Sequence, residues 1–425
     1  MAGQRETRTA IGVEVVIVGG GMVGMTLAAA LGGIGIPLAL VDERAAAALT
    51  DAEYDGRSSA IAYGSQQALA GIGVWPAMRA EAQPILDIRV SDGDAGGGVS
   101  RLFLHYDHRD LDGRTGPAAP LGYIVENRAI RRALFARLAE LPAVTRLAPA
   151  SVAGVRRDAA GATVVLRDGR RLDGRLVVAA DGAASPVRAG AGIPVAGWTY
   201  PQTGIVCTVG HEKPHRGVAH EHFLPSGPFA MLPMTPLGKQ NRSSVVWTER
   251  NDLVPAMLAL PADEFAAEIE RRFGDSLGRL SVIGGRFAYP LRLLHAARYV
   301  DTRLALVGDA AHVIHPIAGQ GLNLGLRDVA ALAEALVDAR RLGLDIGAAG
   351  ALERYQRWRR FDTLMLMAVT DGLNRLFSND LAPLRLARDL GLAVVDRLPP
   401  VKRLLMRQAM GVLGELPRLV RGERL

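Results

Sequence analysis

The chain of 425 residues is long enough to bury a large core and to form two domains or one elaborated domain. Its hydrophobic content of 49%, beside 22% charged residues, excludes a disordered chain, and its one cysteine, Cys207, excludes an intramolecular disulfide and a cysteine-cluster metal site. The net charge of +7 does not indicate a nucleic-acid-binding protein, because residues 375–425 carry ten Lys/Arg against five Asp/Glu, which is +5 of that charge, beside one aromatic residue, Phe377.

The sequence gives no sign of export or of a membrane span. Residues 1–15 contain no uninterrupted apolar stretch, so we expect no secretory signal, and the single cysteine favours a reducing, cytoplasmic location. Residues 15–41 carry no charge and are long enough to cross a bilayer. However, Pro37 and seven glycines interrupt this stretch, which favours a strand, a turn, a helix and a second strand.

The first predicted element is a buried parallel strand at Val15–Val18, which leads directly into three spaced glycines. Gly19 permits a tight turn, Gly21 lets a pyrophosphate approach the backbone, and Gly24 lets the following helix, over 25–31, pack close to the strand. The N-terminus of that helix offers unpaired N–H groups to phosphates. This combination predicts a nucleotide site.

An acidic residue completes the nucleotide pattern. A second apolar run, Pro37–Val41, ends on Asp42, which lies 18 residues after Gly24. A carboxylate at this spacing accepts hydrogen bonds from ribose hydroxyls. The strand, the glycines, the helix and the acid together indicate a βαβ dinucleotide-binding unit.

The next segments alternate between loops, short strands and helices. A polar loop leads to residues 55–62, which include Arg57, and a helical stretch follows and ends at 71–75. Residues 85–106 alternate in polarity and contain glycine-rich turns, which predicts a hairpin of short strands. Residues 121–138 predict a strand and an amphipathic helix with Ile130, Leu134 and Leu138 on one face.

Residues 144–177 predict a small meander, and the strand 176–180 ends in Asp181-Gly182. A strand that leads into a small, acidic turn before a helix is a second place where the backbone approaches a ligand. Asp181 has an alternative role there as a helix cap. Residues 195–292 then predict an inserted β-rich domain with one helix at 262–273.

The pattern of a buried strand recurs at Leu304–Val307 and opens into Gly308-Asp309. Residues 319–323 precede a helix that we expect to begin near Leu324. The rest of the chain is predicted to be helical, with a break at Pro399-Pro400. These helices are expected over 328–340, 348–377, 382–398 and 401–413.

His312 and His315 have a spacing that metal ligands use, but no carboxylate or third histidine accompanies them locally. Zinc takes three or four protein ligands, so we expect no metal site. The sequence contains no Ser–His–Asp arrangement, Walker loop or HExxH pattern, so hydrolase and kinase functions have no support.

Three motifs, in this order, resemble the fingerprints of the single-component flavoprotein aromatic hydroxylases of the p-hydroxybenzoate hydroxylase type: Gly19-x-Gly21-x-x-Gly24, Asp181-Gly182 and Gly308-Asp309. Four longer stretches resemble, more narrowly, the FAD-dependent hydroxylases of ubiquinone biosynthesis. They are LGYIVENRAIRRAL (121–134), GPFAMLPM (227–234), GDAAHVIHPIAGQGLNLGLRDV (308–329) and LLMRQAMGVLGELPRL (404–419). The similarity covers about residues 13–420.

The resemblance implies an α/β fold, with a Rossmann-like FAD-binding domain, an inserted β-sheet substrate domain and a helical C-terminal region. The implied FAD-binding segments are 1–80, 121–194 and 293–345, the substrate domain takes 81–120 and 195–292, and the helical region takes 346–425. The similarity also implies that FAD, rather than NAD, occupies the glycine site.

The resemblance also implies roles for single residues. Asp42 would hold the adenosine ribose, with its neighbour Glu43 as the alternative because the family normally has glutamate there. Asp309 would bind the ribityl chain, and Arg57 would lie near the flavin. Either Asn127 or Arg128 would lie against the pyrophosphate, and the sequence leaves both open. The full cofactor-binding set is Gly19, Gly21, Gly24, Asp42, Arg57, Asn127, Arg128, Asp181, Asp309, Gly321, Leu322 and Asn323.

The implied activity is that of a monooxygenase of class EC 1.14, which hydroxylates the ring of a polyprenylated phenol or benzoquinol with O2 through a flavin C4a-hydroperoxide. The flavin carries this chemistry, so catalytic side chains stay unassigned, with His312, Pro316 and Gly321 as candidates near it. The alternatives are a hydroxylase of another small aromatic compound, an O2-independent reductase of isoprenoids and a non-enzymatic flavin-holding subunit. The electron donor is NAD(P)H or a partner reductase.

A prenylated substrate resides in the bilayer, so an enzyme that acts on it is expected to have a membrane-binding surface. Residues 384–413 place apolar residues at helical spacings with arginines and Lys402 around them. This pattern predicts peripheral docking on acidic lipid or on a biosynthetic complex. Packing of the same faces against the flavin domain, or an oligomer contact, is the alternative.

Overall fold

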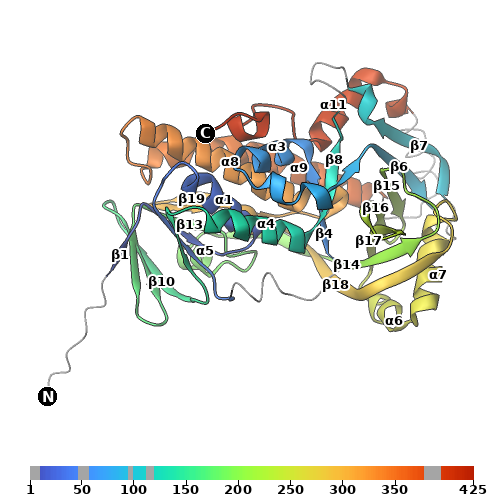
Figure 1. Ribbon diagram of the computed structural model, residues 1–425, viewed down its shortest axis with the longest axis horizontal. Helices are drawn as coiled ribbons and strands as arrows, with labels where there is room; N and C mark the ends of the chain where they lie inside the picture. The colour runs from blue at the N-terminus through green and yellow to red at the C-terminus, as the bar shows by residue number, and fades with distance from the viewer. Residues whose placement is uncertain (1–9, 46–56, 94–98, 112–118, 378–393) are drawn as a thin grey trace.

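The computed structural model describes residues 10–45, 57–93, 99–111, 119–377 and 394–425. Figure 1 shows two regions side by side, one of helices around a parallel sheet and one dominated by a broad, twisted sheet. This arrangement confirms the predicted α/β fold with a β-rich region and a helical C-terminal part. No helix within the described ranges is both long enough and apolar enough to cross a bilayer.

A mostly parallel sheet forms the centre of the first region. Its strand order is β19 (Val300–Asp301), β20 (Leu304–Leu306), β13 (Leu176–Ala179), β2 (Val15–Val18), β3 (Leu38–Val41) and β9 (Val144–Leu147). All residues of β2, β3 and β13 are buried, because helices cover both faces of a parallel sheet.

The glycine turn after β2 explains how helix α1 (Met22–Gly32) packs so closely. Gly19 has a φ of +110°, a conformation that glycine adopts without strain. A Cβ atom at Gly24 would lie 1.9 Å from the carbonyl oxygen of Gly19. The sequence therefore requires glycine at both positions for the fold itself.

The predicted meander over 144–177 is wrong at both ends. Its three central strands form a separate sheet together with a short strand from the start of the chain. The order in this sheet is β1 (Ile11–Gly12), β12 (Arg171–Gly174), β11 (Ala162–Leu166) and β10 (Val152–Arg157). The first strand, β9, instead pairs in parallel with β3, and the last, β13, pairs in parallel with β2. A helix, α4 (Asn127–Ala139), precedes β9, and a crossover of this kind delivers a parallel strand.

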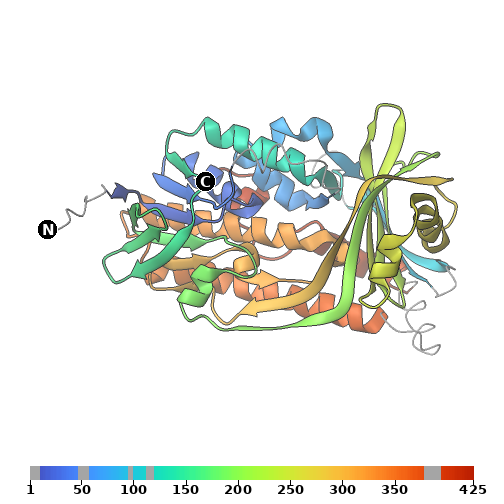
Figure 2. The same cartoon turned by 90° about the horizontal axis from the view of Figure 1, so that it is seen from below.

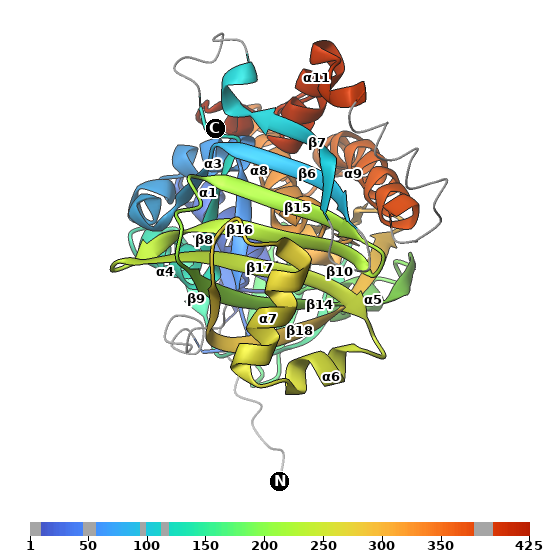
Figure 3. The ribbon, with the colours of Figure 1, turned by 90° about the vertical axis from the view of Figure 1, so that its right-hand side faces the viewer.

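The broad sheet of the second region combines two parts of the chain. Its strand order is β21 (His312–Val313), β18 (Leu280–Ala296), β14 (Val195–His211), β17 (Gln240–Arg250), β16 (Gly227–Leu237), β15 (Val218–Leu224), β6 (Asp87–Gly93) and β7 (Val99–Asp107). Strands β14 and β18 connect the two regions, as Figure 2 shows. Helix α7 (Ala262–Phe273) lies across the outer face of this sheet in Figure 3, with the short α6 (Val254–Ala259) beside it.

Smaller elements join these parts. One short sheet has the strand order β4 (Ser58–Ala62), β8 (Gly122–Glu126) and β5 (Gln83–Ile85). In the chain, α3 (Tyr63–Gly71) follows β4 and α4 follows β8. The one-turn helix α5 (Pro186–Gly190) follows the Asp181-Gly182 turn.

Three helices end the described chain: α8 (Gln320–Arg341), α9 (Ala349–Phe377) and α11 (Pro399–Ala409). Helix α8 begins four residues before the predicted Leu324, directly after Gly319. Pro399 and Pro400 occupy the first turn of α11, where proline costs no helical hydrogen bond. The helix predicted over 382–398 lies mostly outside the described residues.

Candidate active site

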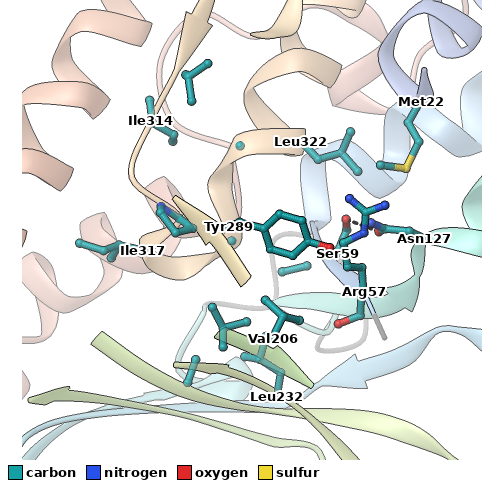
Figure 4. A pocket seen from close by; sticks show the side chains of 18 of the residues that line it. Met22, Arg57, Ser59, Asn127, Val206, Leu232, Tyr289, Ile314, Ile317 and Leu322 are labelled. Atoms are coloured by element: carbon teal, nitrogen blue, oxygen red, sulfur yellow. Dashed lines mark hydrogen bonds between the residues drawn. The ribbon is translucent and has the colours of Figure 1, made fainter. Parts of the chain in front are cut away.

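A cavity of about 580 Å³ lies between the parallel sheet and the broad sheet. One wall comes from the turns after β2, β13 and β20 and from the start of α8, and the opposite wall comes from β14 to β18. Figure 4 shows Tyr289 in its centre, with Arg57 and Asn127 on one side and Val206 and Leu232 on the broad sheet. Ligands of open α/β sheets bind at this edge, beyond the carboxyl ends of the strands.

The structure brings part of the predicted site set into the cavity wall. The lining residues from that set are Gly21, Arg57, Asn127, Asp309, His312, Pro316, Gly321 and Leu322. The predicted residues that support the wall from behind, or lie beside it, are Gly19, Gly24, Asp42, Arg128, Asp181 and Asn323.

Asp42 lies at the carboxyl end of β3, beside the glycine turn. Its carboxylate accepts hydrogen bonds from the backbone N–H of Gly20 at 2.6 Å and of Arg44 at 2.7 Å. These bonds use two of about four acceptor positions on a carboxylate, so the others stay available to a ribose. The geometry agrees with the predicted ribose role, which stays a prediction.

Arg57 and Asn127 approach the cavity from neighbouring elements (Figure 4). The guanidinium of Arg57 lies over the ring of Tyr289, at 5.4 Å from its centre. The amide oxygen of Asn127 accepts a hydrogen bond from the hydroxyl of Ser59 at 2.7 Å, which leaves the amide N–H groups for an acceptor such as a phosphate. These two side chains therefore present donors to the same wall.

Arg128 is oriented differently from Asn127. Its guanidinium donates to the carboxylate of Glu126 at 2.5 Å, and the same carboxylate pairs with Arg242 of β17 at 2.9 Å. Arg128 does not line the cavity. Between the two residues that the sequence left open, the structure favours Asn127 for a pyrophosphate contact.

Asp309 projects into the cavity from the turn after β20. No donor among the described residues hydrogen-bonds its carboxylate. Asp309 keeps surface open to the cavity, but the protein packed around its carboxyl raises the pKa of Asp309 above its ordinary value. An acceptor in this setting fits a hydroxyl-bearing ligand chain, since a hydroxyl donor would relieve the lost hydration.

Asp328 of α8 fixes the turn that carries Asp309. Its carboxylate is 0% exposed and accepts hydrogen bonds from the N–H of Gly308 at 3.0 Å and from Nε2 of His312 at 2.6 Å. Its other oxygen accepts from Nε of Arg359 at 2.8 Å. Burial alone would raise the pKa of Asp328, but the charges and hydrogen bonds of His312 and Arg359 lower it.

The second acidic turn takes the alternative role considered above. The carboxylate of Asp181 accepts a hydrogen bond from the backbone N–H of Val187 at 3.2 Å, at the start of α5. Burial raises the pKa of Asp181 above its ordinary value. Its neighbour Gly182 lines the cavity, so the backbone of this turn, rather than the carboxylate, faces a ligand.

The start of α8 offers backbone donors without a side-chain cap. Gly319 precedes the helix in a left-handed conformation, and Gly321 and Leu322 of the first turn line the cavity. The unpaired N–H groups and the positive end of the helix dipole there stabilise a negative group. The side-chain amide of Asn323 binds the backbone of Ala60 and Ala62 on β4, and the predicted cofactor contact of Asn323 stays a prediction.

The two histidines of the predicted pair face different partners. His312 lines the cavity and binds Asp328, whereas His315 is fully buried with its ring 5.1 Å from the ring of Tyr200, edge to face. Burial lowers the pKa of His315 to about 4, so this imidazole is neutral at physiological pH. Within the described ranges, no group of three potential ligands surrounds either one.

The residues present fit FAD. Gly21 has open space in front of it, the carboxylate of Asp309 faces the cavity, and an uncapped helix start faces the same cavity. Sequence reasoning missed Asp328 and Tyr289. For Asp328, a charged residue inside an apolar helix face was a signal that the sequence offered. For Tyr289 the sequence offered no signal.

Comparison with known proteins agrees with this site. The family model described as "FAD binding domain" matches residues 12–360. The chain is 56% identical to ubiquinone hydroxylase UbiL of Rhodospirillum rubrum, across 96% of this chain and 92% of the relative. It is 35% identical to 3-demethoxyubiquinol 3-hydroxylase of Escherichia coli, across 94% of this chain and 98% of the relative.

A solved structure, p-nitrophenol 4-monooxygenase PnpA from Pseudomonas putida DLL-E4, shares the fold with a TM-score of 0.76 at 22% identity, across 94% of this chain and 98% of that one. The predicted family, fold class and cofactor are thereby confirmed. The chain belongs to the FAD-dependent hydroxylases of ubiquinone biosynthesis.

Proposed function

We propose that this protein hydroxylates the aromatic ring of a polyprenylated phenol or benzoquinol intermediate of ubiquinone biosynthesis. The observation that carries the proposal is the division of the cavity. Its donors and Asp309 lie on the side of the glycine turn, whereas Val206, Leu232 and Ile314 give the other side an apolar surface. Such a cavity suits a polar cofactor beside a greasy aromatic ring.

Bound FAD supplies the redox chemistry and the activation of O2. The protein contributes binding, orientation and exclusion of water. The first turn of α8, with Gly321 and Leu322, would hold the flavin ring system and would stabilise negative charge on it. Apolar side chains around Tyr289 keep water from the reacting ring, and Asp328 holds the turn of Asp309 in place.

The direct test uses purified protein with a prenylated phenol, O2 and each of NADH, NADPH or a reductase as the electron donor. We expect protein-bound FAD and a product one oxygen atom heavier, detected by mass spectrometry and absent without O2. A saturated isoprenoid formed without O2 would instead establish the reductase alternative. In cells, deletion of the gene should cause an unhydroxylated prenylphenol to accumulate.

We also propose that the C-terminal helices dock on an acidic lipid surface. On α11, Val401, Leu404 and Leu405 are exposed rather than packed, with Leu404 at 51%. Part of the predicted surface, residues 384–393, lies outside the described residues. Lys402, counted among its cations, is held in ion pairs with Asp110 and Asp396 and serves the fold.

Helix α9 adds an apolar face that the sequence did not single out. Its exposed apolar residues recur at helical spacing: Phe361, Leu364, Met365, Val369 and Leu376. Phe361 is 72% exposed, and two exposed arginines precede it, Arg357 by one helical turn and Arg360 by one residue. An apolar face bordered by arginines is typical of helices that bind membrane interfaces.

We predict that the protein sediments with phosphatidylglycerol vesicles at low salt and less with neutral vesicles or at high salt. Each arginine near an anionic surface contributes about 1 kcal/mol. The double variant Phe361→Glu/Leu404→Glu should lose this binding. Leu342→Glu, at an exposed leucine just after α8, is the matched control and should bind normally. Equal binding of all three proteins would contradict the proposal.

A further inference from the structure

The cavity wall formed by the broad sheet is mostly apolar but includes one carboxylate, that of Glu221. The strand register aligns Val206 of β14 with Val246 of β17, Val246 with Ala230 of β16, and Ala230 with Glu221 of β15. Residues aligned in this way point to the same face of a sheet. All four line the cavity, so a carboxylate ends a row of small apolar side chains.

The neighbouring positions of the wall are apolar or neutral. Leu232, Ala219 and Ile88 line it on one side of this row, and Pro228 and Thr248 line it on the other. His220 precedes Glu221, but its ring packs edge to face on Phe273 of α7, on the outer face of the sheet. Of the described residues that line the cavity from the broad sheet, Glu221 is the only one with a carboxyl group.

We propose that Glu221 binds the phenolic hydroxyl of the substrate and acts as its base. This inference rests on the proposed function, which places a phenol ring against this wall. A phenol presents one strong donor on an otherwise apolar ring, and a carboxylate is the matching acceptor. The row from Val206 to Ala230 then supports the ring itself.

The proton transfer has a clear chemical use. The phenol O–H bond breaks and an O–H bond forms on Glu221, which leaves a phenolate whose ring is richer in electrons. An electron-rich ring reacts faster with an electrophilic oxygen. An electron pair of the ring forms the new C–O bond as the O–O bond of the O2-derived oxidant breaks. The ring carbon then releases its proton to the oxygen left on the oxidant, the ring becomes aromatic again, and Glu221 returns its proton to the ring oxygen.

Tyr106 does not compete with Glu221 as a base. Tyr106 of β7 lies nearby on the same face of the sheet, and burial, followed by the charges of Glu221 and Asp396, raises the pKa of Tyr106 to about 12. Tyr106 is therefore neutral at physiological pH and is no competing base. Arg57, Asp309 and His312 lie on the cofactor side of the cavity.

The test compares the FAD-loaded protein with its Glu221→Gln variant, using 2-geranylphenol and ring-fluorinated derivatives of increasing acidity. Glutamine keeps the shape of the side chain but cannot take a proton. We expect about 10-fold weaker binding of 2-geranylphenol, followed by ultraviolet difference spectra, and about 100-fold slower hydroxylation. Both defects should shrink as the phenol becomes more acidic, since such phenols ionise without a base.

Glu264→Gln, at an exposed glutamate on α7, is the matched control and should leave all values unchanged. FAD content and circular dichroism establish that Glu221→Gln is folded. If its binding matches wild type, or if its defects are the same for every phenol, the inference is overturned. If wild type binds the phenol through Glu221 but forms no hydroxylated product, the proposed function fails while the binding role of Glu221 stands.

Discussion

Replacement of Asp328 with alanine should destabilise the protein by about 3–5 kcal/mol, which is the usual cost of removing one partner from a buried ion pair. The substitution leaves Arg359 and His312 buried without this carboxylate and removes the acceptor of the Gly308 N–H. Because the same carboxylate holds the turn of Asp309, FAD content should fall as well. Thermal unfolding and flavin absorbance measure the two effects.

Asp252→Asn is the matched control for Asp328→Ala, because Asp252 also pairs with an arginine, Arg250, but on the surface. Its side chain is 59% exposed and that of Arg250 is 64% exposed, so water replaces much of the lost interaction. We expect a much smaller loss of stability and normal FAD content. If both variants lose stability equally, the burial of Asp328 is not what makes it important.

The sequence was most informative where function depends on neighbouring residues. The run Val15–Val18, the glycines after it and Asp42 form one local unit, and the structure places Gly21 in the cavity wall as that unit requires. Helix α7 was predicted with its observed ends because its apolar positions recur every three to four residues between Pro261 and Gly274.

Long-range geometry was less accessible. Strands β14 and β18 each run for 17 residues, but shifts in their register interrupt the alternation that marks a strand. The sequence predicted a β-rich domain over 195–292, but the full length of these two strands was not predicted. Glu221 escaped notice for a related reason: the face of a residue on β15 follows from its register with the neighbouring strands β16 and β6, which sequence alone does not provide.

Residue roles diverged where tertiary contacts decide them. Asn323 was predicted to bind the cofactor, which stays a prediction, and the sequence did not predict that its side-chain amide holds β4 to the start of α8. Asn127 and Arg128 are adjacent, but only Asn127 faces the cavity, because Arg128 is held in an ion pair with Glu126. Asp328 binds groups that are 16 to 31 residues distant, so its importance is visible only once α8, α9 and the turn after β20 are assembled.

The largest effect on cofactor binding is expected at Gly21. A Cβ atom there would meet nothing within 4 Å, because it would point into the open space of the cavity wall. Gly21→Leu should therefore fold normally and place its side chain where the pyrophosphate approaches the helix N-terminus. Loss of two hydrogen bonds to a charged group costs about 3–6 kcal/mol, so FAD affinity should fall at least about 100-fold.

Two other glycines separate this effect from a general loss of structure. Gly190→Leu, at an exposed position with open space, should retain both fold and FAD. Gly24→Ala should fail to fold, because its Cβ would lie 1.9 Å from the carbonyl oxygen of Gly19. Flavin absorbance and fluorescence titration, with circular dichroism as the folding check, distinguish the three variants. A folded Gly21→Leu protein with full FAD content would refute the assignment of this turn to the pyrophosphate.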